Sequence, residues 1–280
     1  MRDAHASQTS AAVAAARALA HHHKLVDGFD DPFGARLLPP PWNQLVAALL
    51  ADGRGIRLLR APLAPLLRMA AGYMALRARA LDEAIFRAPP TAQVVILGAG
   101  LDTRAWRLPS LAGRDLYEVD HPATQSAKEA RLGSLPPPRA RRVPVAVDFT
   151  RDALAERLSA AGHDAAHPTV WIWEGVVMYL PEAAIRATLS VVQARSAPGS
   201  VLGLSYLGGG PVRALLQPTV ALLGEPLRSE LSAGAVSALL QEYGATVLVD
   251  WSEAEQAERW LRSGKLPFDV PERVALAQWG

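Results

Sequence analysis

The stretch VVILGAGLDTRAWRLP, Val94 to Pro109, decides the fold of this chain. An apolar run ends at Gly98 and Gly100, and polar and aromatic residues follow. An apolar run bounded by glycines is typical of a buried strand that turns sharply into a helix. In an open parallel sheet, ligands bind beyond the carboxyl ends of the strands, where the winding reverses. The stretch therefore predicts a strand, a ligand-holding turn and a helix.

Short apolar runs separated by helical stretches fill the chain after Pro89 and Pro90. The runs are QVVIL, DLYEV, RVPVAV, TVWIW, SVLGLS, ATVLV and, at the end of the chain, RVALAQW. Strands that alternate with helices need crossover connections, and right-handed crossovers give a mostly parallel sheet covered on both faces. The sequence predicts a doubly wound α/β domain.

The first third of the chain has helical periodicity instead. Its helical stretches are TSAAVAAARALA, WNQLVAALLADG and LLRMAAGYMALRARALDEAIF, with the glycine- and proline-rich DGFDDPFGARLLPPP between the first two. We expect a helical cap over residues 1–88 and the main domain over 89–280. A lid-like insertion is expected at about 206–232, and the whole forms one structural unit.

Composition limits the class of protein. With 280 residues, half of them hydrophobic, the chain can bury a large core, and the absence of cysteine excludes disulfides and thiolate chemistry. The apolar N-terminal run contains Arg17 and precedes three histidines, His21 to His23, unlike a signal peptide. No run approaches the roughly 18 apolar residues of a membrane span. We expect a cytoplasmic protein without membrane contact.

Neither nucleic acid nor metal is indicated. The net charge is +2 and the arginines are spread along the chain, with one tight cluster at Arg139, Arg141 and Arg142. Adjacent histidines in regular structure do not converge on one ion, so His21 to His23 favour a solvated helix end over a metal site.

Two carboxylates follow the next two strands. Asp120 lies twenty residues after Gly100, and Asp148 follows VPVAV. Such oxygens can accept hydrogen bonds from ribose hydroxyls and from an adenine amino group. The dinucleotide fingerprint wants glycine or alanine three residues after Gly100, but Thr103 stands there. The pattern favours a nucleoside without pyrophosphate, such as S-adenosylmethionine; alternatively, both aspartates only cap helices.

These motifs resemble the leucine carboxyl methyltransferase family, including its bacterial small-molecule branch. The resemblance rests on VVILGAGLDTRAWRL, LYEVDHPATQSAK, the aspartate after VPVAV, and WIWEGVVMYLP. SQTSAAVAAARALA, DDPFGARLL and GEPLRSE extend it over nearly the whole chain. The resemblance implies a class I S-adenosylmethionine-dependent O-methyltransferase with a seven-stranded sheet and an N-terminal helical lid.

The resemblance also implies roles for individual residues. Gly98, Ala99 and Gly100 line the cofactor, and Asp120 holds its ribose. Asp148 and Phe149 frame the adenine, with His121 packed against the adenosine. The methionine end of the cofactor is held by Arg77, with Arg79 as the alternative arginine, and by Glu174.

Several of these residues also have a structural interpretation. Glu174 interrupts the most apolar stretch of the chain, so it needs a cationic or hydrogen-bonding partner if buried, and it can also cap a helix. His121 precedes a proline that starts a helix, which favours packing over base catalysis. Asp102, Thr103 and Arg104 can fix the turn or touch the ligand.

Methyl transfer from a sulfonium is an in-line displacement, for which the protein must align the reactants and exclude water. A carboxylate acceptor is ionised at neutral pH and needs no base, whereas a phenol does. The sequence shows no obvious base. Tyr179, Tyr206 and His121 are the candidates on the acceptor side, and His163 and His167 lie in an expected loop.

The expected product is a methyl ester of a small hydrophobic, polyketide-like acid, with S-adenosylhomocysteine as the co-product. Apolar residues and flexible glycines in YLGGGPVRALLQPTVALLGEPLR suit a lid over such an acceptor. The alternatives are a phenol or hydroxyl acceptor, a methyltransferase-fold scaffold without turnover, and a nicotinamide-dependent oxidoreductase. A small molecule is favoured over a protein acceptor, and the sequence predicts no oligomeric state.

Overall fold

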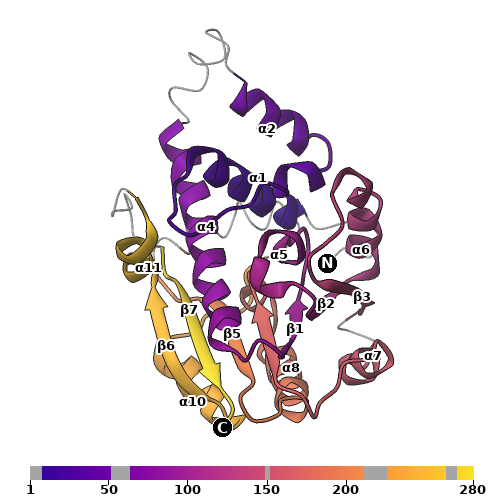
Figure 1. The fold of residues 1–280 in the computed structure, drawn as a ribbon. Helices are drawn as coiled ribbons and strands as arrows, with labels where there is room; N and C mark the ends of the chain where they lie inside the picture. Colours follow the sequence, from indigo (N-terminus) through magenta and orange to yellow (C-terminus); the bar gives the residue numbers. More distant parts are fainter. Residues whose placement is uncertain (1–7, 52–63, 149–151, 211–212, 214–225, 263–269) are drawn as a thin grey trace.

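The structure is a computed structural model that describes residues 8–51, 64–148, 152–210, 213, 226–262 and 270–280. A twisted seven-stranded sheet has helices on both faces, and the N-terminal helices lie above the carboxyl ends of its parallel strands (Figure 1). No helix within these ranges is long and apolar enough to cross a membrane.

The sheet has the order β3-β2-β1-β4-β5-β7-β6. Its strands are β1 (Gln93–Leu97), β2 (Asp115–Asp120), β3 (Arg141–Ala146), β4 (Thr169–Trp173), β5 (Val201–Leu207), β6 (Thr246–Ser252) and β7 (Glu272–Gln278). Strands β1 to β5 pair in parallel, and β7 is antiparallel to both β5 and β6. The predicted doubly wound, mostly parallel sheet is confirmed. The winding reverses between β1 and β4, which is the position where such sheets bind ligands.

Strand β1 shows why these apolar runs form the centre of the sheet. Val95 and Leu97 belong to the core cluster on one face, and Val94 and Ile96 to the cluster on the other. Side chains alternate between the faces of a strand, so a strand buried on both faces is continuously apolar. Helices α7 (Leu154–Ala160), α8 (Glu182–Ala194) and α10 (Ala233–Glu242) cover the first face.

The other face is covered by α4 (Ala64–Arg87) and α5 (Arg104–Arg107), with α11 (Glu253–Trp260) packed on α4. A methyl group on Gly203 of β5 would lie 3.0 Å from Leu81 Cδ2, so α4 approaches the sheet closely. Helix α4, the third helical stretch of the expected cap, therefore packs on the sheet. The division of the chain into a cap and a main domain at residue 88 stays a prediction.

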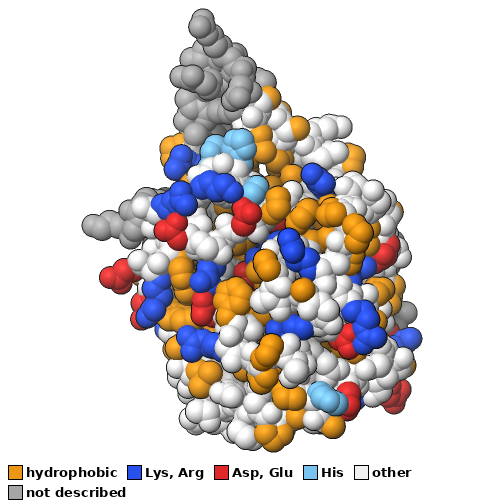
Figure 2. Space-filling model, in the orientation of Figure 1, with side chains coloured by type: hydrophobic (Ala, Val, Ile, Leu, Met, Phe, Trp, Pro, Cys, Tyr) orange, Lys and Arg blue, Asp and Glu red, His pale blue; other side chains and the backbone are white. Residues whose placement is uncertain are grey.

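Helices α1 (Gln8–His23) and α2 (Trp42–Leu50), with the short turn η1 (Gly34–Leu37), complete the N-terminal region. The three histidines form the last turn of α1, where His21 Nδ1 lies 2.6 Å from Asp30 Oδ1. Most of the expected insertion at 206–232 lies outside the described residues. Figure 2 shows Lys and Arg side chains dispersed over one face of the molecule.

Trp171 in β4 should contribute strongly to stability, because its side chain is 0% exposed and its Nε1–H donates to Ser196 Oγ at 2.9 Å. We expect Trp171→Ala to lower the free energy of unfolding by about 3 to 5 kcal/mol, the usual cost of such a cavity. Leu248→Ala at a 40% exposed position is the control, with a change within about 0.5 kcal/mol. Equal losses in urea unfolding would contradict the prediction.

Candidate cofactor and acceptor site

The turn after β1 is held in a conformation that requires glycine. The N–H groups of Gly98 and Ala99 donate to Val119 O at 2.8 and 3.0 Å, which ties the turn to β2. Gly98 and Gly100 have φ values of +73° and +48°. A methyl group on Gly98 would lie 2.4 Å from Val176 Cγ2, and one on Gly100 would lie 2.9 Å from Ser10 Cβ. The loop after β4 and helix α1 thus both pack closely against this turn.

Asp120 ends β2 beside the glycine turn. Its Oδ2 accepts the N–H of Gly100 at 2.5 Å, and its Oδ1 accepts the N–H of His121 at 2.6 Å. The residue is 7% exposed, and burial raises the pKa of its carboxyl to about 6 although the two N–H donors lower it. Each carboxylate oxygen has a second lone pair for another donor. The carboxylate can therefore accept two further hydrogen bonds.

His121 caps helix α6 (Pro122–Glu129), and Pro122 occupies the first helical position as expected. Its Nδ1 accepts the N–H of Ala123 at 3.2 Å. A neutral imidazole that accepts at Nδ1 carries its hydrogen at Nε2. The free side of the ring is therefore a donor, which favours the packing interpretation over base catalysis.

Glu174 follows β4 and has the cationic partners that its apolar surroundings require. Its Oε1 lies 3.1 Å from Arg77 Nε, and its Oε2 lies 2.9 Å from Arg104 Nη2. Burial alone would raise the pKa of the Glu174 carboxyl, but Arg104 and Arg77 outweigh it and the pKa lies below its ordinary value. Of the expected cationic or hydrogen-bonding partners, the structure shows two cations, and both are arginines of this chain.

The two arginines of GYMALRAR have different environments on α4. Arg77 bonds to Glu174 and, through Nη1, to Glu272 Oε1 of β7 at 2.9 Å. Arg79 instead bonds to Glu83 and stacks 5.0 Å from the ring centroid of Trp260. Of this pair, Arg77 is the one that lines the cavity described below.

Asp102, Thr103 and Arg104 fix the turn. The N–H of Arg104 donates to Asp102 Oδ1 at 2.6 Å, and its guanidinium pairs with Asp102 and with Asp82 Oδ1 at 2.7 Å. Thr103 Oγ1 donates to Asp31 Oδ1 at 2.8 Å. Arg104 is 0% exposed, so its charge is balanced entirely by these carboxylates and Glu174. Asp102 also reaches the cavity wall.

One cavity of about 470 Å³ collects most of the candidate residues. The sequence-predicted residues on its wall are Arg77, Gly98, Ala99, Gly100, Asp120, His121, Asp148, Glu174 and Tyr179. Most of them follow the ends of β1, β2, β3 and β4, and Arg77 comes from α4. The strand ends meet because the carboxyl ends of parallel strands share one edge of the sheet. Phe149 lies outside the described residues.

Other residues on the cavity wall were not singled out from the sequence, although they lie in the expected cap and lid. Thr9, Ser10, Val13 and Arg17 come from α1, and Pro226 and Arg228 from the last part of the expected insertion. Arg17 donates to Leu101 O at 2.7 Å and pairs with Asp31 Oδ2 at 3.2 Å. A charged residue inside the apolar run AAVAAARALA was the available signal, by the same reasoning as for Glu174.

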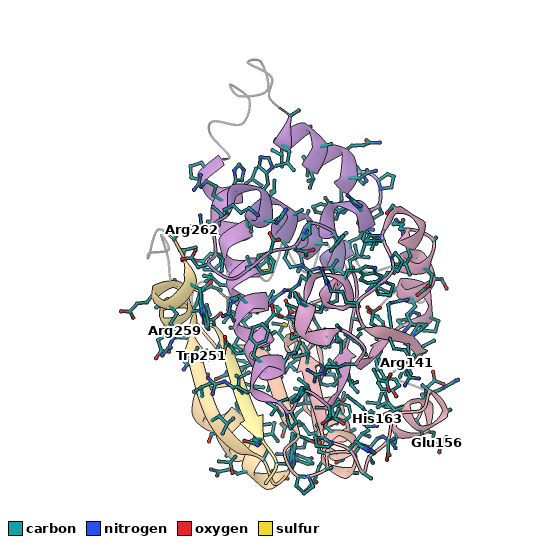
Figure 3. The ribbon with its side chains drawn as sticks, viewed as in Figure 1. Arg141, Glu156, His163, Trp251, Arg259 and Arg262 are labelled. Atoms are coloured by element: carbon teal, nitrogen blue, oxygen red, sulfur yellow. The ribbon has the colours of Figure 1, made fainter. Side chains whose placement is uncertain are left out.

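Tyr206 does not lie on the described cavity wall, so the structure does not bring it together with the other candidates. Its side chain is 0% exposed and its hydroxyl donates to Asp250 Oδ2 at 2.5 Å. His163 is also remote: its Nε2 lies 3.0 Å from Thr169 Oγ1, and burial lowers its pKa to about 4. Figure 3 shows His163 at the end of the molecule opposite α1 and α2. His167 is exposed and lies 2.7 Å from Asp164.

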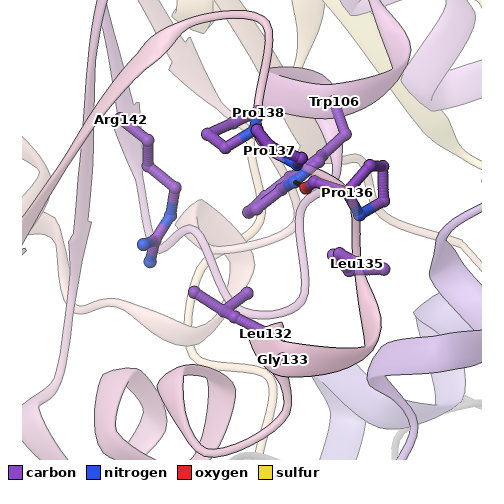
Figure 4. A pocket seen from close by; sticks show the side chains of 8 residues that line it. All are labelled: Trp106, Leu132, Gly133, Leu135, Pro136, Pro137, Pro138 and Arg142. Atoms are coloured by element: carbon purple, nitrogen blue, oxygen red, sulfur yellow. Dashed lines mark hydrogen bonds between the residues drawn. The ribbon is translucent and has the colours of Figure 1, made fainter.

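A second cavity lies beside Trp106 (Figure 4). Its wall is formed by Trp106, Leu132, Gly133, Leu135, Pro136, Pro137, Pro138 and Arg142. Arg142 pairs with Glu118 Oε2 at 2.8 Å and with Glu129, so its charge is already balanced. This wall carries no carboxylate or nucleophile in its described part, and the first cavity is the stronger candidate.

The fold and the carboxylates around the glycine turn define a class I S-adenosylmethionine-dependent methyltransferase. Residues 10–193 match the leucine carboxyl methyltransferase family, and the chain belongs to that family. A relative from Streptomyces coelicolor, provisionally named an S-adenosyl-L-methionine-dependent methyltransferase, is 39% identical over 225 residues. The match covers 78% of this chain and 72% of that protein. A relative of the same provisional name from Mycolicibacterium gilvum is 42% identical over 154 residues, or 52% of this chain and 50% of that protein.

Solved structures agree on the fold. A protein from Thermobifida fusca, provisionally named a methyltransferase, aligns with a TM-score of 0.53 at 17% identity, over 83% of this chain and 92% of that one. Magnesium protoporphyrin IX methyltransferase from Synechocystis, solved with S-adenosylhomocysteine, aligns with a TM-score of 0.50 at 12% identity, over 80% and 96%. The family and the relatives named above show that the cofactor is S-adenosylmethionine, not the nicotinamide of the alternative interpretation.

Gly98→Ala should destabilise the fold through both backbone and contact. The positive φ costs about 1 to 2 kcal/mol for a side chain, and the added methyl group meets Val176 Cγ2. Gly98→Ala/Val176→Ala removes the second cost and should recover part of the loss. Gly113→Ala has the same φ of +73° with no atom within 4 Å, so it isolates the backbone cost. Urea unfolding that ranks Gly113→Ala equal to Gly98→Ala would contradict the close approach.

Proposed function

We propose that this chain transfers the methyl group of S-adenosylmethionine to a carboxylate of a small hydrophobic, polyketide-like molecule, forming a methyl ester. The observation that carries the proposal is one cavity whose described wall combines two sets of residues, the glycine turn with its carboxylates and apolar residues from α1 and from the segment between β4 and α8. We assign the first set to a cofactor half and the second to an acceptor half. The second set suits an apolar acceptor next to the cofactor.

In the proposed cofactor half, the residues fit the parts of S-adenosylmethionine. Asp120 has lone pairs left for two ribose hydroxyls, and the close approach at Gly98 and Gly100 leaves backbone facing the ligand. Asp148 would accept from the adenine amino group. Arg77 would bind the carboxylate at the methionine end and Glu174 the ammonium, because each offers the opposite charge.

The proposed acceptor half is lined by Val13, Val176, Tyr179, Leu180, Pro181 and Ala184. These residues come from α1 and from the segment between β4 and α8, so the two segments would enclose the acceptor and exclude water. When bound, S-adenosylmethionine supplies a methyl group on a positively charged sulfur, whose departure to an acceptor oxygen leaves a neutral thioether. The chain has to align that oxygen with the methyl group.

The lack of an obvious base on the described wall supports a carboxylate acceptor. The ordinary pKa of a carboxylic acid, near 4, leaves the acceptor ionised at neutral pH, so no side chain has to remove a proton. A phenol or hydroxyl acceptor needs a base. His121 lines the cavity, but its Nδ1 already accepts from Ala123, which does not favour it as that base. A hydroxyl acceptor and a scaffold without turnover are outcomes of the following test.

Incubation with deuteromethyl-labelled S-adenosylmethionine and a panel of hydrophobic carboxylic acids should give labelled methyl esters, detected by mass spectrometry. The corresponding phenols and primary alcohols are included as competing acceptors. Esters without aryl or alkyl ethers are the expected result. Ethers alone would establish the hydroxyl alternative. Cofactor binding without any labelled product across the panel, while a phenol-methylating enzyme works in the same assay, would favour the scaffold.

Lower pH should weaken the binding of S-adenosylhomocysteine through Asp120. The pKa of its carboxyl is raised to about 6 by burial, and ribose hydroxyls bind the ionised form better. Binding then lowers this pKa, so affinity should fall as the pH falls below about 6 and stay constant above it. Calorimetry across this range measures the effect.

Asp120→Asn is the matched variant for this measurement, because it keeps the shape and has no proton to lose. We expect weaker binding with a flatter pH dependence. The same pH dependence in both proteins would show that another group titrates, and unchanged affinity would remove Asp120 from the site.

A further inference from the structure

We infer that Arg228 binds the carboxylate of the acceptor and selects hydrophobic monocarboxylic acids; this inference rests on the proposed function. Arg228 lies on the wall of the same cavity as Tyr179, Leu180 and Pro181. It comes from the last part of the expected insertion, which was assigned to the acceptor, whereas the residues assigned to the cofactor come from α4 and the strand ends. The position therefore belongs to the acceptor half.

The backbone around Arg228 is fastened to the turn that follows β4. The N–H groups of Arg228 and Ser229 donate to Met178 O at 2.7 and 3.2 Å, and Ser229 Oγ donates to Val177 O at 2.8 Å. Leu227 is buried in a cluster with Met178 and Leu207. Its two neighbours in the chain, Pro226 and Arg228, instead line the cavity. The segment is therefore held with Leu227 in the cluster and Arg228 at the cavity wall.

The charge of Arg228 is available to a ligand. Of the other two arginines of this wall, Arg17 pairs with Asp31, and Arg77, which pairs with Glu174 and Glu272, is assigned to the carboxylate of the cofactor. Among the residues that the structure describes, no carboxylate lies within ion-pair distance of Arg228. A guanidinium offers planar, directional donors that suit a carboxylate better than a neutral group.

This arrangement is compatible with methyl transfer. With one carboxylate oxygen on the guanidinium, the other is free to attack in line. Its lone pair forms the bond to the methyl carbon, and the electrons of the broken carbon–sulfur bond stay on sulfur. No proton moves and no further reactant is needed. The apolar residues beside Arg228 would receive the hydrocarbon part of the acid, so the expected class is an apolar body with a single carboxylate.

The test measures binding to the protein saturated with S-adenosylhomocysteine, so that it does not depend on turnover. Cinnamate, 1-naphthoate and decanoate are each compared with the primary amide of the same acid by calorimetry. The protein should bind at least one acid about tenfold more tightly than its neutral amide, the size expected for a charge-assisted hydrogen bond. Arg228→Gln should abolish this preference, and Arg228→Lys should keep part of it.

The control variant is Arg141→Gln, which removes an exposed arginine at the start of β3, at the amino edge of the sheet (Figure 3). It should keep the full preference, and all three variants should bind S-adenosylhomocysteine like the unaltered protein. The inference is overturned if Arg228→Gln keeps the preference for acids, or if the unaltered protein prefers none of the three acids to its amide.

The result is separable from that of the methyl-transfer assay. An acid preference that depends on Arg228, without any methyl ester formed, leaves the inference standing and removes the proposed reaction. Methyl esters formed with equal KM by the unaltered protein and Arg228→Gln leave the reaction standing and overturn the inference.

Discussion

The guanidinium of Arg104 joins three of the segments that surround the cavity. It contacts Asp82 of α4, Asp102 of the turn after β1 and Glu174 after β4. Burying charges is costly, and removing one member of such a set leaves the others without compensation. Although burial lowers the pKa of Arg104, the neighbouring carboxylates raise it well above its ordinary value, so the group stays charged. The turn, the long helix and the fourth strand are therefore held in one arrangement.

This ion network also explains how a carboxylate and a guanidinium group can both stay charged at the proposed methionine end. Glu174 is shared between Arg104 and Arg77, and Arg77 is shared between Glu174 and Glu272. Neither group is left as an isolated buried charge before a zwitterionic ligand arrives. The carboxylate and ammonium of such a ligand would add opposite charges together, which keeps the local balance unchanged. Preorganised charges of this kind need little rearrangement on binding.

Local patterns predicted the sheet and much of the candidate site. Each of the seven apolar runs overlaps a strand. In β1, β4 and β5 the reason is continuous burial, which leaves a continuous apolar signature. Gly98, Asp120, Asp148 and Glu174 follow such runs and thus share one edge of the sheet. Tyr206 also lies near the end of a run, but its hydroxyl meets Asp250, forty-four positions away in the chain. Its direction depended on a neighbouring strand that no local pattern specifies.

The sequence by itself determined which segments become strands and helices, where glycine is obligatory and which acids follow the strands, because these properties depend on residues close together in the chain. The tertiary structure decided which arginine faces the cavity, which cations neutralise Glu174 and that α1 and Arg228 complete the wall. These contacts join residues far apart in sequence, such as Arg77 and Glu272. Their geometry follows from how helices pack on the sheet, which spacing along the chain does not encode.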